Sequence, residues 1–306
     1  MTRARALLGA RIGFVLLAIG CAWWGFGGRW SEIGAAVAGT DPLRLCAAVL
    51  CALAGLALTG VLWRSLLAAL GSQVSLQDAG AVFFVGQLGK YVPGSVWTFA
   101  AQAQLGRRHG VPLRSSVTAS ALFLVLHTFT GGLLGGGLAA VGVVRTEIGV
   151  GWWLLLAVLS AAALTPPGLR LLGDRLAGAG ARTRFAPADL ARASVLMGAV
   201  WAFYGVCLWV LVPFAGPTPE DVLVAVAAFA LAHAAGVLLV LAPAGLGARE
   251  AVLIALLAPA VGIPGAAAAA LLARVAHTIA DFSLAAGAAG WAARGRSREA
   301  VGVGDA

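Results

Sequence analysis

The sequence predicts an all-α polytopic membrane protein, with six transmembrane helices and two re-entrant helical hairpins arranged as an inverted repeat. Hydrophobic residues make up 61% of the 306 residues and charged residues only 11%, whereas soluble domains contain about 25% charged residues. The mean hydropathy of +0.95 points the same way. The apolar runs are long and do not alternate with a period of two, which excludes a membrane β-barrel.

The first half of the chain, about residues 1–147, contains three runs long enough to cross a bilayer and one pair of short arms. A crossing helix needs about 20 apolar residues, and arms of about 10–14 residues are typical of re-entrant segments. The expected elements are spans at about 12–28, 43–68 and 114–140, and between the last two a hairpin at about 78–106 with arms 78–89 and 95–106.

The second half, about residues 148–306, repeats this order in the opposite orientation. The expected elements are spans at about 150–168, 193–213 and 265–291, and before the last span a hairpin at about 221–260 with arms 221–241 and 250–260. We therefore expect one integral membrane domain made of two inverted halves. Inverted repeats with broken helices at their interface are typical of alternating-access transporters.

The basic residues predict the orientation of this layout. Cytoplasmic loops of membrane proteins are enriched in Lys and Arg. With both termini in the cytoplasm, the first hairpin entering from inside and the second from outside, 15 of the 21 basic residues are cytoplasmic and three lie outside. We therefore attribute the net charge of +9 to topology and not to nucleic-acid binding, and we expect a multi-pass protein of a bacterial inner (plasma) membrane.

Several ionisable residues lie inside the predicted membrane segments or at the hairpin turns. They are Lys90, Arg249, Glu250, Arg274, His277 and Asp281. Such a side chain at the bilayer centre costs about 2.5–3.5 kcal/mol on insertion scales, so it is retained where it faces a polar cavity or a partner. Positions 274, 277 and 281 share one helical face. We predict an anion-binding cavity, in which these cations and the helix N-termini at the turns bind a phosphate.

The alternative is internal pairing, with Arg249 bound to Glu250 or Asp281 and Arg274 bound to Asp281, so that the charges only hold helices together. Other candidates for the cavity lie at the turns and along the neighbouring helices. The glycines among them would let the backbone approach a phosphate closely. These further candidates are Tyr91, Gly94, Gln102, Gly245, Gly247 and His127.

Two interpretations of His127, inside the span at about 114–140, stay open. An interhelical hydrogen bond is the simpler one, and proton coupling is the alternative. No catalytic motif or nucleotide-binding loop is present, and the four cysteines have no metal-ligand spacing. We therefore expect neither an enzyme nor a bound metal or other cofactor.

At the two hairpin turns the sequence resembles the lysylphosphatidylglycerol synthase transmembrane (flippase-like) family. The resemblance rests on Gly86-Gln87-Leu88-Gly89-Lys90-Tyr91-Val92-Pro93-Gly94 with Arg107-Arg108-His109-Gly110-Val111, and on Pro243-Ala244-Gly245-Leu246-Gly247-Ala248-Arg249-Glu250. Arg274 is similar to the arginine of the family's last span. Two features depart from the family: the 306 residues hold no aminoacyltransferase domain, so we expect no lipid synthesis, and Leu124-Val125 stands where a Glu-Arg pair is usual.

The resemblance implies a stand-alone lipid flippase that moves a phospholipid such as (lysyl)phosphatidylglycerol between leaflets. Its partner would be a membrane phospholipid with an anionic headgroup. Two alternatives stay open: a carrier for polyprenyl-phosphate-linked sugars, and a non-transporting membrane scaffold. A connected cavity favours transport, whereas complete internal pairing of the charges favours the scaffold.

Overall fold

The computed structural model describes residues 28–92, 96–177, 187–216, 218–238 and 245–302, and the regular elements of these residues are all helical. The expected span at 12–28 lies outside them, except for Gly28. Five described helices are long and apolar enough to cross a membrane, and the bent pair α7–α8 adds a sixth if it is one span. The all-α polytopic membrane fold is therefore confirmed. The helices are α2 (Trp30–Ala38), α3 (Pro42–Ala69), α4 (Leu76–Gln87), η1 (Leu88–Tyr91), α5 (Trp97–Arg107), α6 (Leu113–Ala140), α7 (Val150–Ala163), α8 (Pro166–Ala177), α9 (Pro187–Trp209), α10 (Pro219–Leu238) and α11 (Ala248–Gly302).

Local signals in the sequence explain where several helices begin. Asp41 caps α3 by accepting a hydrogen bond from the Leu43 amide, and Pro42 occupies the first turn, where its missing N–H costs nothing. Ser75 caps α4: its hydroxyl accepts from the Asp78 amide and donates to the Asp78 carboxylate. These caps set the start of the segment that carries the first hairpin.

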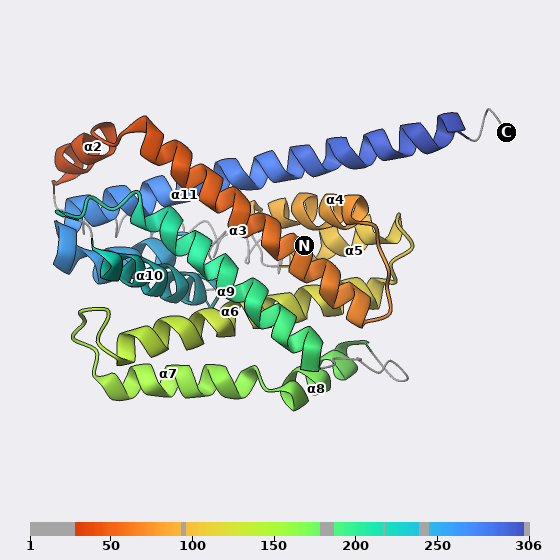
Figure 1. Cartoon of the computed structure of the whole chain (residues 1–306), viewed down its shortest axis with the longest axis horizontal. Helices are drawn as coiled ribbons and strands as arrows, with labels where there is room; N and C mark the ends of the chain where they lie inside the picture. Colours follow the sequence, from red (N-terminus) through yellow and green to blue (C-terminus); the bar gives the residue numbers. More distant parts are fainter. Residues whose placement is uncertain (1–27, 93–95, 178–186, 217, 239–244, 303–306) are drawn as a thin grey trace, which may run out of the picture.

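The first hairpin consists of α4, η1 and α5. The helices α4 and α5 have 12 and 11 residues, so neither is long enough to cross a bilayer. Figure 1 shows them side by side, with their outer ends at the end of the bundle where α3 finishes and α6 starts. The short helix η1 lies between them and carries Lys90 and Tyr91, which are half-buried in the bundle.

The second hairpin differs from the expectation. The first arm is the helix α10, whose 20 residues are enough to cross a membrane by length and composition. The second arm and the last span are joined in α11, which breaks only at Gly262, where φ is +72°. Pro259 and Pro264 flank this break, and each lacks the N–H that a continuous helix needs. The re-entrant character of this segment and the inverted repeat stay predictions.

The described helices pack into one bundle (Figure 1). The helix α3 lies along α9, α6 lies between α7 and α10, and α4 packs on α11. Fully buried aromatic side chains, including Trp63, Phe83 and Trp201, fill the interior. The elements that surround the candidate site are α3, α4, η1, α5, α6, α9, α10 and α11.

Candidate functional site

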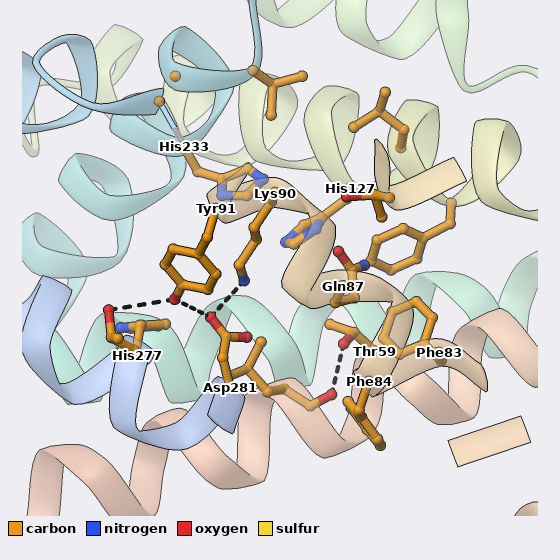
Figure 2. A pocket seen from close by; sticks show the side chains of 18 of the residues that line it. Thr59, Phe83, Phe84, Gln87, Lys90, Tyr91, His127, His233, His277 and Asp281 are labelled. Atoms are coloured by element: carbon orange, nitrogen blue, oxygen red, sulfur yellow. Dashed lines mark hydrogen bonds and ion pairs between the residues drawn. The ribbon is translucent and has the colours of Figure 1, made fainter. Parts of the chain in front are cut away.

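A cavity of about 340 Å³ lies where the two hairpin turns meet the long helices. Seven α-helices and η1 contribute polar or aromatic side chains to its described wall, and Figure 2 shows many of these side chains directed at one space. The charged, histidine and aromatic side chains of the wall include Lys90, Tyr91, His127, Tyr204, Phe229, His233, Arg249, Arg274, His277 and Asp281. The cavity therefore combines positions that lie far apart in the chain, such as Tyr91 and Asp281, which are 190 residues apart.

The first turn brings Lys90 and Tyr91 to Asp281 of α11. The Lys90 Nζ lies 2.6 Å from the Asp281 Oδ2, and the Tyr91 hydroxyl donates to the same oxygen over 2.7 Å (Figure 2). The turn is tight at Gly89, where a Cβ would lie 2.7 Å from the backbone nitrogen of Thr98. Only glycine fits this approach, and it is what carries the two side chains toward α11.

The second turn is held to α11 by Glu250. Its Oε2 accepts a hydrogen bond from the Gly247 amide over 2.8 Å, and its Oε1 accepts from the Arg274 Nε. Gly245 has a φ of +68°, and a Cβ there would meet the Gly236 backbone at 2.9 Å. The internal pairing of Arg274 with Asp281 is therefore wrong: Glu250 is its partner, and Asp281 is bound by Lys90.

Arg249 has no carboxylate partner among the described residues. Its guanidinium carbon lies 4.3 Å from the centre of the Phe229 ring, in a cation–π contact. The alternative pairing of Arg249 with Glu250 or Asp281 is thus not formed among the described residues. Around the cavity three cations face two carboxylates, which leaves one positive charge in excess within the described structure. The Nη2 of Arg274 is also buried without a hydrogen-bond partner there, so it keeps donors for a ligand.

The opposite wall consists of histidine and aromatic rings. His127 and His233 are stacked, with ring centres 4.2 Å apart. His277 stacks on Phe229 at 4.9 Å and contacts Tyr204 edge-on at 5.0 Å. The Nε2 of His127 is buried and has no hydrogen-bond partner in the described part of the chain, so the interhelical hydrogen bond stays a prediction.

The sequence model described as the lysylphosphatidylglycerol synthase TM region matches residues 10–285. The chain belongs to this family. A comparison with curated proteins finds no match. The family supplies a membrane-embedded helical region, and the cavity lies entirely within the matched residues.

Most of the site residues predicted from the sequence line this cavity. They are Lys90, Tyr91, Gln102, His127, Gly245, Arg249, Arg274, His277 and Asp281. Glu250 and Gly247 are not part of the wall, but they position Arg274 and the second turn. Gly94 lies outside the described residues.

Gln102 has a different surrounding from the other candidates. The Ser120 hydroxyl donates to its Oε1 over 2.5 Å, and the Trp63 Nε1 donates to Ser120. Its own Nε2 lies 3.5 Å from the Phe83 carbonyl oxygen. Both ends of the amide are therefore engaged within the bundle, and Gln102 mainly joins α5 to α6 and α4.

Sequence reasoning missed Tyr204, Phe229 and His233. A signal existed for His233, because a histidine inside an apolar helix is costly unless it faces a polar space. No comparable signal existed for Tyr204 and Phe229, since aromatic residues are common in any membrane helix. Only the packing of α9 and α10 against α11 brings these rings to the cavity.

Proposed function

We propose that the protein transports a phospholipid between the two leaflets, with the phosphate of the headgroup bound in the cationic cavity. The observation that carries the proposal is Arg249, a cation on the cavity wall with no carboxylate partner among the described residues. A charge removed from water is costly unless a partner neutralises it, so this site favours an anionic ligand. Arginine also binds phosphate through two parallel hydrogen bonds.

The size of the cavity supports binding of a headgroup alone. Its volume of about 340 Å³ is at the small end of the range for small-molecule sites, so acyl chains would stay in the bilayer. Two apolar residues of the wall, Val92 and Leu124, keep exposed surface. Leu124 belongs to the central part of α6, a helix long and apolar enough to cross a membrane. We propose that the lipid tails pass beside these two residues.

The scaffold alternative explains only part of the charge pattern. The pairs Lys90–Asp281 and Arg274–Glu250 are what helix tethers require. Helix tethering explains neither Arg249, whose charge stays unneutralised within the described residues, nor the cavity beside it. Transport accounts for both. Polyprenyl-phosphate-linked sugars share the phosphate, so the experiment includes them as a separate arm.

The proposal is tested by leaflet exchange in reconstituted vesicles. Labelled phosphatidylglycerol, lysylphosphatidylglycerol and a polyprenyl phosphate are compared in separate preparations. We expect exchange of at least one phospholipid, and a loss of about tenfold or more in Arg249→Gln, because a charge-assisted hydrogen bond to phosphate contributes about 1.5–3 kcal/mol.

Arg145→Gln is the matched control, because Arg145 is an exposed arginine in the connection between α6 and α7. This variant should exchange lipid at the parent rate. Exchange of the polyprenyl phosphate alone would select the carrier of linked sugars. Exchange of none of the three lipids would refute transport, and full activity of Arg249→Gln would refute the proposed site.

A further inference from the structure

The three cavity histidines are not used by the proposed binding of a phosphate, although all of them line the same space. Only four histidines occur in the chain, and the fourth, His109, pairs with Asp78 away from the cavity. Side chains of His127 and His277 are 6% and 7% exposed. Each has a buried Nε2 without a hydrogen-bond partner in the described structure. An unpaired buried polar group costs free energy, so the burial of these nitrogen atoms needs an explanation.

The geometry of His277 identifies its free nitrogen as a proton acceptor. Its Nδ1 lies 2.9 Å from the carbonyl oxygen of Ala273, so the neutral ring carries its hydrogen on Nδ1. The Nε2 then presents a lone pair. The neighbouring Cys207 Sγ is 4.0 Å from Nδ1 and does not reach Nε2 by any described contact. His277 can thus take up one proton without losing a hydrogen bond.

The charges around the histidines decide when that proton binds. Arg249, Lys90 and Arg274 line the same cavity as the three histidines. Asp281 is paired with Lys90 and Glu250 with Arg274, so the described wall of the cavity carries one excess positive charge. A protonated histidine would add a second positive charge to this wall, and like charges in one cavity repel.

A bound anion would offset this excess charge. The Phe229 ring contacts both side chains, the Arg249 guanidinium at 4.3 Å and the His277 ring at 4.9 Å, and both residues line the same cavity. An anion bound to Arg249 would therefore lower the cost of a proton on His277. The stacked pair His127–His233 can hold at most one proton, because two like charges at 4.2 Å repel strongly. Tyr204, which contacts His277 edge-on, adds no charge of its own.

We propose that the cavity binds one proton on the Nε2 of His277 together with its anionic headgroup, so that lipid and proton cross the membrane together. This inference rests on the proposed function. By linkage, the proton raises the affinity for the anion by the same factor as the anion raises the affinity for the proton. A monoanionic headgroup that carries one proton is then moved as a neutral complex.

The test uses vesicles with labelled phosphatidylglycerol and a trapped pH indicator. This probe is a phosphodiester, whose charge stays constant between about pH 6 and about pH 8, so any pH dependence comes from the protein. We expect exchange to accelerate as the pH falls, by up to about tenfold per pH unit for one linked proton. We also expect proton flux alongside lipid flux, and a rate that does not change with an imposed membrane potential.

His277→Gln should lose the pH dependence and the proton flux, and its exchange should become sensitive to the potential. His277→Phe, which preserves the stack on Phe229, tests the same point if the glutamine variant folds poorly. His109→Gln is the matched control and should behave like the parent. Absence of exchange at every pH would overturn the proposed function itself. Exchange without proton flux in the parent protein would overturn the proton site at His277 alone. The same conclusion would follow if His127→Gln, and not His277→Gln, abolished the pH dependence and the proton flux.

Discussion

Replacing Asp281 by asparagine tests whether the first hairpin turn is fixed by charge. The Asp281 carboxylate is 6% exposed and binds the Lys90 Nζ at 2.6 Å and the Tyr91 hydroxyl at 2.7 Å. An asparagine oxygen still accepts from Tyr91, so the substitution removes mainly the charge. Loss of one partner of a buried ion pair costs about 3–5 kcal/mol. Because the Lys90 side chain is 31% exposed, water screens the remaining ammonium, and we expect a loss of about 1–3 kcal/mol in the free energy of unfolding.

A double-mutant cycle separates this charge effect from other damage. Lys90→Met retains the alkyl chain of the lysine and removes its charge. In that background Asp281→Asn should destabilise the protein by at least about 1 kcal/mol less than in the parent, because no unpaired ammonium is left behind. Unfolding in detergent, followed by tryptophan fluorescence, measures the four proteins. An equal cost of Asp281→Asn in both backgrounds would show that the two residues are not coupled, and the reasoning about the turn would fail.

Two further predictions concern the backbone and the orientation. Gly89→Ala should destabilise the protein by about 1–3 kcal/mol, since its Cβ would meet the Thr98 backbone at 2.7 Å. Gly137→Ala is the control and should be neutral, because nothing lies within 4 Å of its Cβ position. Equal thermal stabilities of the two variants would contradict the tight turn. In a chain without its native cysteines, a membrane-impermeant thiol reagent should label Gly151→Cys in intact cells and Ala191→Cys only after permeabilisation. The reverse pattern would overturn the orientation with cytoplasmic termini.

Much of the site could be predicted from the cost of placing charge in a membrane. Lys90, Arg249 and Arg274 stand out in the sequence because ionisable residues inside apolar helices need a functional or structural partner. Their grouping around one cavity agrees with that reasoning. The partners were not predictable in the same way. Arg274 binds Glu250, 24 positions earlier, because the break at Gly262 separates the second turn from the helix that carries Arg274.

The sequence by itself determined that the protein lies in a membrane and that its elements are helices. The physical reason is that backbone groups in lipid must be paired within each segment, so composition and run length are enough to predict the fold class. They also indicated a first turn with arms too short to cross. They did not determine the length of α10, which is long enough to cross although its apolar run was interpreted as a short arm.

Only the tertiary structure decided which charges neutralise each other and which charge has no carboxylate partner among the described residues. Ion pairing depends on distances of a few ångströms between helices, and no one-dimensional pattern contains those distances. The packing of α10 on α11 placed Phe229 and His233 beside Arg249 and His277, and it left Arg249 on a ring instead of a carboxylate. The functional proposals follow from that arrangement, because an excess charge and a free histidine nitrogen come together in one cavity.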